Sequence, residues 1–333
     1  MNKNIKNIAI VRLSALGDIV NSAVVLQFIH THYPDAKIEW ITEEVFAPLL
    51  QNHPLISKVH TINLKKVKKT KSLSLFKETV KKLRNLNDFD IVIDMQGLLK
   101  SAIVSRLLSS NTHGFDKNST RESLAASLYK NSSNIAYGIG VVNRNTFLIG
   151  DALGFEISDA MILNKKPIFP ITNNIVLNNK VKNIAFVIGA SWESKIYPKE
   201  KVLKLCNSLK EKVYIIWGSE EERVNAEWIC EKSEYATLAP KLKLDELVSF
   251  ISQMDLLIGN DTGPTHMAWA QNIPSITLLG PTTTRMIYQT PYNIGIKSPS
   301  EVNILKIDKN DFSIKEILYK DILDKAKELL HGL

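Results

Sequence analysis

The sequence has few cysteines and no long apolar segment. Cys206 and Cys230 are the only two thiols among 333 residues. They are too few for a disulfide framework and lack the paired spacing of a zinc site, so we expect both to be reduced and structural. No uninterrupted apolar run could span a bilayer, and the amino terminus leads into a short strand-like run without the apolar core of a signal peptide. These absences predict a cytoplasmic protein.

The glycine fingerprint of dinucleotide-binding domains, Gly-x-Gly-x-x-Gly, is also missing. Its nearest likeness, Gly138-Ile-Gly140, has Asn143 at the third position, where glycine lets helix and strand pack closely. The sequence therefore gives no support to a dehydrogenase that uses a nicotinamide cofactor.

The sequence has fewer acidic than basic residues. Lys and Arg number 42 against 34 Asp and Glu, which gives a net charge of +8 and a pI near 9.2. This excess favours anionic partners, which include nucleic acids, phosphorylated metabolites and membrane surfaces. The densest positive run comprises Lys65, Lys66, Lys68, Lys69 and Lys71.

This lysine run has two interpretations. Such a run is most often a solvated face, and the functional alternative is a patch that meets anionic lipid headgroups. Nucleic acid is disfavoured, because the run has no interleaved aromatic residues and the sequence contains no nucleic-acid-binding module. Farther along, Arg121 and Arg144 are isolated cations near predicted loops, and either could be an ordinary surface arginine.

The chain is longer than a usual single domain, so we expect two domains. Strand-like and helical stretches alternate in both halves, which predicts α/β domains with parallel sheets covered on both faces. The strand-like runs are 7–13, 37–41, 59–62, 89–94, 183–188, 212–217, 255–258 and 275–279. Between Leu163 and Asn183 proline and asparagine replace periodic apolar residues, which predicts a linker. We therefore predict two doubly wound, Rossmann-like domains over 1–170 and 180–312. A final helix over about 314–333 can pack back on the first domain.

The most informative stretch is 256–270, where an apolar run breaks at Gly259 and polar residues and then resumes at helical spacing. This pattern predicts a strand, a loop and a helix. In an open α/β sheet such a loop leaves the carboxyl end of a strand, and the free amides of the next helix bind anions. The groups presented there would be Asp261, Thr262, Gly263 and His266. The alternative is that Asp261 or Thr262 only caps the helix and His266 packs beneath it.

Three more predicted strands of the second half end in small or polar residues. They supply Gly189-Ala-Ser191 with Lys195 close behind, Gly218-Ser219 followed by Glu220 to Glu222, and Gly280-Pro-Thr-Thr-Thr284. Loops at one edge of one sheet would form a composite pocket, with a cation and helix amino termini for a diphosphate and a carboxylate for a ribose diol. The glutamates could instead serve only the helix dipole, and Lys195 could be an exposed lysine.

The motifs resemble those of the heptosyltransferases of glycosyltransferase family 9. The matching pieces are Ser14-Ala-Leu-Gly-Asp18, Lys195 before Tyr197-Pro198, Trp217-Gly218 followed by glutamates, and Asp261-Thr-Gly-Pro-Thr-His266, within a match from about Ile8 to about Tyr288. The resemblance implies the GT-B architecture, with two domains facing one another across a cleft. It also implies inverting, metal-independent and cofactor-free transfer of L-glycero-D-manno-heptose from ADP-heptose to Kdo of Kdo-lipid A. This reaction belongs to the lipopolysaccharide inner core and implies a peripheral enzyme at the cytoplasmic face of the inner membrane.

The resemblance also assigns roles to residues. Asp18 would be the general base that deprotonates the acceptor hydroxyl, and Lys195 would bind the donor phosphates. The remaining donor-site residues would be Ser191, Asp261, Thr262, Gly263, His266 and, beside adenine, Leu242. For the ribose, counting from Trp217-Gly218 favours Glu222, whereas alignment on the acidic run favours Glu220. The anionic acceptor would meet Lys65, Lys66, Lys68, Lys69, Arg121 and Arg144.

Other functions stay open at this stage. Another family 9 transferase, adding a later heptose or a different sugar, would have much the same donor pocket. A non-catalytic nucleotide-sugar-binding protein would keep the pocket but would not need Asp18. An aspartic protease also uses Asp-Thr-Gly but needs two catalytic aspartates on a β-rich scaffold, whereas this α/β sequence has one such triplet.

Overall fold

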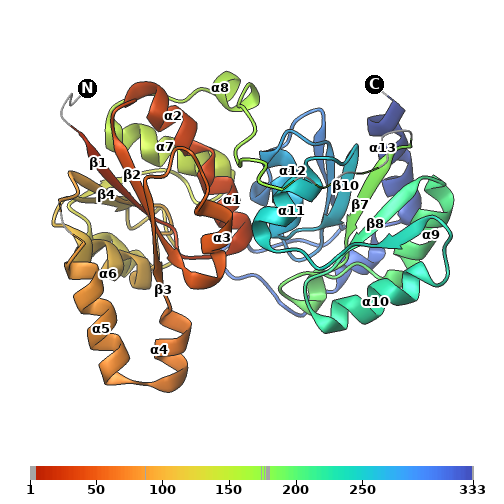
Figure 1. Cartoon of the computed structure of the whole chain (residues 1–333), viewed down its shortest axis with the longest axis horizontal. Helices are drawn as coiled ribbons and strands as arrows, with labels where there is room; N and C mark the ends of the chain where they lie inside the picture. Colours follow the sequence, from red (N-terminus) through yellow and green to blue (C-terminus); the bar gives the residue numbers. More distant parts are fainter. Residues whose placement is uncertain (1–4, 87, 174, 176, 178–180, 332–333) are drawn as a thin grey trace. The chain divides into compact units, whose positions relative to one another are not determined.

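The computed structural model describes residues 5–86, 88–173, 175, 177 and 181–331. The chain divides into two compact units, residues 1–168 (unit 1) and 169–333 (unit 2). Each unit is built on a parallel β-sheet (Figure 1). The division falls inside the segment whose proline and asparagine content predicted a linker.

Unit 1 contains a sheet in the order β3-β2-β1-β4-β5-β6. Its strands are β1 (Asn7–Val11), β2 (Lys37–Glu43), β3 (Lys58–Ile62), β4 (Ile91–Asp94), β5 (Thr112–Phe115) and β6 (Asn131–Ser133). The central strand β1 pairs in parallel with β2 on one side and β4 on the other. The chain therefore winds outward in both directions from β1, and the crevice between β1 and β4 is the switch point at which such sheets bind ligands.

Helices cover both faces of the unit 1 sheet. They are α1 (Leu16–Ala23), α2 (Val25–His32), α3 (Ala47–Leu50), α4 (Leu64–Thr70), α5 (Leu73–Arg84), α6 (Leu99–Leu108), α7 (Val141–Leu153) and α8 (Asp159–Leu163), with short 3-10 turns at Glu44–Phe46 and Ser123–Leu128. Ala9 and Val11 pack in one core with Leu83 of α5 and Val104 of α6. The intervening residue Ile10 is equally buried. Alternate β1 residues point to opposite faces, so both faces are covered.

Unit 2 repeats this plan with the order β12-β11-β10-β7-β8-β9. Its strands are β7 (Asn183–Val187), β8 (Lys212–Ile216), β9 (Ala236–Leu238), β10 (Leu256–Asn260), β11 (Ser275–Leu279) and β12 (Asn293–Lys297). Its helices are α9 (Lys199–Leu209), α10 (Glu220–Cys230), α11 (Leu244–Ile251), α12 (Gly263–Ala270) and α13 (Tyr319–His331), with 3-10 turns at Glu193–Lys195, Thr284–Met286 and Ser313–Glu316. The switch point lies between β7 and β10, and the loops that follow these two strands carry Ser191 to Lys195 and Asp261 to His266.

The final helix corrects one prediction. Ile322, Ala326 and Leu330 recur every four residues along α13 and lie in the hydrophobic core of unit 2. The helix packs against α9. Residues 319–331 therefore belong to the second unit, because their apolar stripe is buried in its core.

Both cysteines are free thiols, as predicted. Cys206 is buried and Cys230 is partly buried in the unit 2 core, and burial raises the pKa of Cys206 to about 12 and that of Cys230 to about 11. These thiols are therefore unreactive packing residues at neutral pH. Across residues 5–331, apart from the few positions left undescribed, no helix is both long and apolar enough to cross a membrane.

Candidate active site

Three side chains predicted for the donor site meet in the interior of unit 2. The Asp261 carboxylate lies 2.8 Å from Nζ of Lys195 and 3.1 Å from Nε2 of His266. All three residues are buried, with Asp261 only 2% exposed. Burial by itself would raise the pKa of Asp261, but the Lys195 ammonium and the His266 hydrogen bond outweigh it and hold that pKa far below its usual value. Asp261 is therefore a buried carboxylate that stays charged. We call these residues the buried triad.

Asn260 explains why these residues meet. Its amide donates to the carbonyl oxygens of Ile188 and Gly189, and its side-chain oxygen accepts from the Tyr197 amide at 3.1 Å. These bonds tie the end of β10 to the loop that follows β7, so Lys195 is brought against Asp261. Asn260 was not among the predicted residues, although a polar residue ending an apolar strand directly before Asp261 was a usable signal.

Glu222 is the acidic residue that reaches the loop after β7. Ser219 caps α10 by accepting from the Glu222 amide, and the Glu222 carboxylate accepts from the Gly218 amide at 2.6 Å. The same carboxylate lies so close to Gly189 that a Cβ there would come within 2.2 Å of it. Glu220 instead pairs with Arg223 and is mostly exposed. Glu222 thus caps its helix, as the helix-dipole alternative expected, and also contacts the loop that follows β7.

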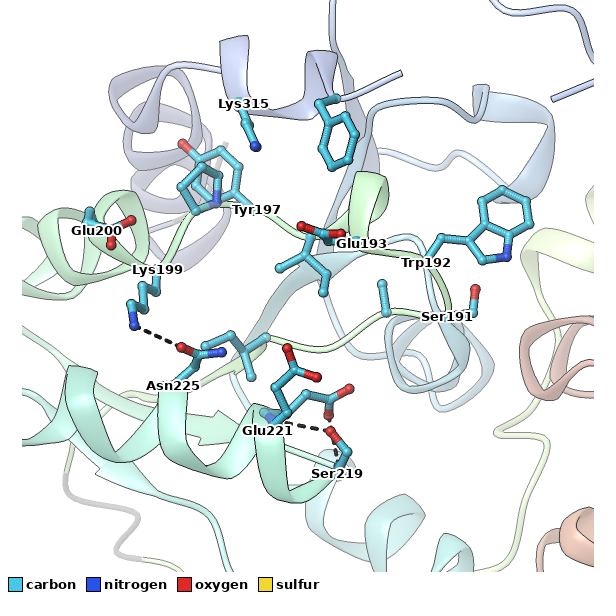
Figure 2. Close-up of a pocket in the computed structure, with 16 residues that line it drawn as sticks. Ser191, Trp192, Glu193, Tyr197, Lys199, Glu200, Ser219, Glu221, Asn225 and Lys315 are labelled. Atoms are coloured by element: carbon cyan, nitrogen blue, oxygen red, sulfur yellow. Dashed lines mark hydrogen bonds between the residues drawn. The ribbon is translucent and has the colours of Figure 1, made fainter. Parts of the chain in front are cut away.

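A cavity of about 810 Å³ opens beside Glu222 (Figure 2). Its lining includes Ser191 and Glu222, together with the unpredicted Trp192, Lys199 and Phe312. In Figure 2, Ser191 and Trp192 lie on the loop after β7, with Glu221 on α10 and Ser219 at the N-cap of that helix. A volume of this size accommodates a small-molecule ligand.

The remaining predicted donor residues occupy loops at the same edge of the sheet. Thr262 is the N-cap residue of α12 and Gly263 is its first residue. Pro264 has no N–H, and the amides of Thr265 and His266 donate to the Thr262 carbonyl. The Gly263 amide is therefore the group at this helix start that suits an anion. Leu242 is half-buried in the loop between β9 and α11. This loop is held near β8, because Nε1 of Trp217 donates to the Ala239 carbonyl at 2.8 Å.

In unit 1, Asp18 lies in the first turn of α1, just past the carboxyl end of β1. Its Oδ1 is 2.8 Å from Nη2 of Arg12, and its Oδ2 accepts from the Ala15 amide at 3.2 Å. Arg12 is buried and also donates to the Met95 carbonyl after β4. The Asp18 side chain is 28% exposed, so the carboxylate is held in place yet accessible. Arg12 was missed because a basic residue at the end of a strand looks like a surface residue.

A second unpredicted cation lies beside this loop. Nζ of Lys100, in the first turn of α6, is 3.3 Å from Oγ of Ser14. Glu43, at the end of β2, is buried, and its burial raises its pKa while the charges of Lys100 and Lys65 oppose the rise. Asp18, Lys100 and Lys65 are thus gathered around the carboxyl edge of one sheet. Strand order brings them together, which the sequence alone does not reveal.

The predicted acceptor residues divide into exposed and buried groups. Lys65, Lys66, Lys68 and Lys69 are exposed on α4, and Arg121 is exposed in the loop before the 3-10 turn at Ser123–Leu128. Arg144 is different. Its guanidinium is buried, stacks over Phe115 and donates to the backbone carbonyls of Ser119, Ile135 and Ala136. Through these bonds Arg144 holds the loop two residues before Arg121. Its burial argues against the direct contact with an acceptor that was expected.

The chain is similar to known proteins over nearly its whole length. Residues 77–306 match the model of glycosyltransferase family 9 (heptosyltransferase). Lipopolysaccharide heptosyltransferase 1 of Campylobacter coli is 41% identical over 97% of this chain and 98% of that protein. The protein of the same name from Pseudomonas aeruginosa is 27% identical over 83% of this chain and 79% of that protein. The solved structure of the E. coli heptosyltransferase WaaC with ADP-2-deoxy-2-fluoro heptose has a TM-score of 0.80 at 23% identity, and the similarity covers 97% of this chain and 99% of that chain.

Proposed function

The chain belongs to glycosyltransferase family 9, the heptosyltransferases, and from this premise we propose that it transfers L-glycero-D-manno-heptose from ADP-heptose to Kdo of Kdo-lipid A. The family resemblance and the GT-B fold class predicted from the motifs are confirmed. The protein is therefore an enzyme, and its activity contributes to the lipopolysaccharide inner core.

The arrangement at the unit 2 switch point supports the donor assignment more than any other observation. The buried triad, the start of α12 and Glu222 all lie at the carboxyl edge of this sheet. The positive end of α12, with the Gly263 amide, suits the diphosphate, and a carboxylate at the position of Glu222 suits a ribose diol. An ammonium has three donors, so Lys195 can bind Asp261 and still donate to a phosphate oxygen.

In the proposed reaction, the acceptor hydroxyl oxygen forms a bond to the anomeric carbon as the bond from that carbon to the diphosphate breaks. Asp18 takes the hydroxyl proton and ADP leaves with the bonding electrons. Attack opposite the leaving group inverts the anomeric centre. Donors held against the diphosphate stabilise the negative charge that develops there, which is the largest contribution a preorganised site makes. We propose that the reaction needs no metal, and unchanged turnover in excess chelator is the expected result.

We propose that the acceptor side lies at the carboxyl edge of the unit 1 sheet. Asp18 stands there with Lys100 and Lys65 nearby, and cations at this edge suit the carboxylate of a Kdo sugar. Lys66, Lys68, Lys69 and Arg121 would meet other negative charges of the acceptor, with Arg144 supporting the Arg121 loop. Since this acceptor is a lipid, the enzyme would work in the cytoplasm, peripherally at the anionic face of the inner membrane.

A later heptose addition within the same family is the second candidate. Lipopolysaccharide heptosyltransferase 3 of E. coli is 24% identical over 80% of this chain, well below the 41% identity of the Campylobacter coli protein. A protease is not supported, because Asp261 is sealed in an ion pair on a parallel sheet. A binding protein without activity would have no use for the Asp18 carboxylate held by Arg12.

The proposal is tested by the products. The enzyme is incubated with ADP-heptose and lipopolysaccharide that ends at Kdo, and with lipopolysaccharide that already carries the first heptose. Mass spectrometry should find one added heptose on the first acceptor and none on the second. Extension of only the second acceptor would favour the later-heptose candidate, and extension of neither would refute the proposal.

A further inference from the structure

The net charge of the protein is concentrated in one helical hairpin. Residues 64–84, which form α4, a short turn and α5, contain nine of the 42 basic residues and one of the 34 acidic residues. The rest of the chain therefore has 33 of each and no net charge. The nine basic residues are all exposed, and they are Lys65, Lys66, Lys68, Lys69, Lys71, Lys77, Lys81, Lys82 and Arg84.

An apolar stripe on α5 accompanies this charge. Leu73, Phe76, Val80 and Leu83 recur at helical spacing, so they lie along one side of the helix. Their burial is graded, because Leu83 is 1% exposed in the core, Val80 is half-buried, Phe76 is 51% exposed and Leu73 is 76% exposed. The stripe thus continues outward beyond the point where the protein core covers it.

The hairpin is an ordered part of unit 1. Asn63 caps α4 by accepting from the Lys66 amide, and Ser72 caps α5 by accepting from the Leu75 amide. Nζ of Lys82 donates to the Thr61 carbonyl of β3 at 2.8 Å. Figure 1 shows α4 and α5 side by side, extending away from the sheet of unit 1. Such a fixed hairpin presents its exposed end as a preformed surface.

We propose that the α4–α5 hairpin docks on an anionic phospholipid bilayer, with Leu73 and Phe76 entering the headgroup boundary and the lysines around them contacting lipid phosphates. A cationic helix with an exposed apolar stripe is the surface that such bilayers bind, through apolar burial together with charge attraction. Lysine stems can cover the apolar residues while their ammonium groups stay at the phosphates. The inference rests on the proposed function only in that a lipid acceptor requires the enzyme to reach a membrane.

Vesicle binding tests the docking surface directly. The full chain is sedimented with vesicles of phosphatidylcholine alone, and with vesicles of equal parts phosphatidylcholine and phosphatidylglycerol. Binding to the mixed vesicles only is expected. Leu73→Ser with Phe76→Ser should weaken it at least tenfold. Lys77→Gln with Lys81→Gln should weaken binding to the mixed vesicles more than tenfold, because each lysine near the bilayer surface contributes roughly fivefold.

Matched variants on unit 2 serve as controls. Val224 and Leu318 are as exposed as Phe76 but lie outside the hairpin, so replacing both with Ser should leave vesicle binding unchanged. The proposal is overturned if Leu73→Ser with Phe76→Ser binds as tightly as the wild type, or if the wild type ignores the mixed vesicles. It is also overturned if single-stranded RNA binds the hairpin more tightly than the vesicles and displaces them.

Activity separates this inference from the proposed function. On an acyl-free Kdo acceptor in solution, the Leu73 and Phe76 variant should keep wild-type kcat/KM, because neither residue belongs to the proposed acceptor site. On Kdo-lipid A embedded in the mixed vesicles it should lose at least tenfold. If the variant were as active as the wild type on both acceptors, the docking surface would be contradicted. Failure of the wild type to transfer heptose to either acceptor would instead refute the proposed function, while the binding results would still decide the docking surface.

Discussion

Nη2 of Arg12 lies 2.8 Å from Oδ1 of Asp18, and the same guanidinium donates to the Met95 carbonyl. Arg12 directly follows β1 and is buried, whereas Asp18 is partly exposed in the first turn of α1. The arginine therefore links the ends of two neighbouring strands, β1 and β4, to the proposed base. The direction in which Asp18 points is fixed by the core of unit 1.

This relationship predicts a positioning role for Arg12. A charge-assisted hydrogen bond contributes about 1.5 to 3 kcal/mol, so Arg12→Gln should lower kcat by about ten- to a hundredfold. Arg12→Lys should recover part of that loss, because it keeps the charge but not the two-pronged geometry. KM for ADP-heptose should not change in either variant. Steady-state kinetics measure both constants. If both variants raised KM for ADP-heptose to the same extent, the positioning role of Arg12 would be contradicted.

The buried triad predicts a large stability effect in unit 2. Lys195→Ala leaves the Asp261 carboxylate buried without its cation, which should cost about 3 to 5 kcal/mol. Adding Asp261→Asn should restore part of the loss, because the uncompensated charge is removed. Urea unfolding measures both variants, with Arg223→Ala at the exposed pair with Glu227 as a control that should cost little. A double variant no more stable than the single one would show that the ion pair is not the cause.

The buried triad also predicts that the stability of the protein depends on pH in the acid range. The pKa of Asp261 is lowered in the folded chain, so its stabilising effect is present above the unfolded value of about 3.9 and is lost as the pH falls below it. The difference in stability between wild type and Asp261→Asn should therefore shrink below about pH 4. A difference that stays constant down to acid unfolding would contradict this.

Lys100 should affect the acceptor and not the donor. Its ammonium lies beside Ser14, four residues before Asp18, and exposed ion pairs contribute up to about 1 kcal/mol. Lys100→Met should raise KM for the anionic acceptor by up to about fivefold and leave the affinity for ADP-heptose unchanged. Lys37→Met is the matched control, since Lys37 is exposed at the amino end of β2, at the opposite edge of the sheet. Identical effects of the two variants would remove Lys100 from the acceptor site.

His53 predicts a pH dependence in unit 1. It is buried, and Nε2 lies 2.8 Å from the carbonyl of Ile168, the last residue of that unit. Burial lowers its pKa to about 4, against the partial opposition of this carbonyl. The unfolded chain therefore binds the proton more readily, and stability should fall as the pH drops from about 6.5 toward 4, by up to about 3 kcal/mol.

The measurement for His53 is hydrogen exchange of β1 and β4 at several pH values. His53→Gln should flatten the dependence between pH 6.5 and 4, whereas replacing the exposed His30 with Gln should not. An unchanged slope in the His53 variant would assign the acid sensitivity to other groups.

The fold, and the loops at the carboxyl edge of the unit 2 sheet, were largely predictable because they depend on local patterns. Apolar runs that end in small or polar residues marked the strands, and their alternation with helices marked parallel sheets. Strand order then gathered Asp261 and Lys195, which are far apart in the chain, at one edge of unit 2. The motifs placed both residues in the donor site but did not reveal that they form a buried ion pair, which depends on Asn260 joining two strand ends.

What escaped prediction depends on packing between distant segments. Arg12 and Lys100 carry no local sign of their place beside Asp18, since an isolated cation is most often a surface residue. For the same reason Arg144 was taken for an exposed acceptor contact, whereas Phe115 and backbone carbonyls enclose it. The final helix was predicted, but the core that covers its apolar face was not, because periodicity identifies a buried face without identifying its partner.

Single-turnover transfer by wild type and Asp18→Asn tests the central claim most directly. Each enzyme is saturated with ADP-heptose, mixed with Kdo-lipid A and quenched, and the heptosylated product is quantified, with donor binding measured separately by calorimetry. The account predicts that Asp18→Asn binds ADP-heptose like the wild type but forms product about a hundred to ten thousand times more slowly, because it cannot accept the acceptor proton. Product formation at the wild-type rate by Asp18→Asn would contradict the account.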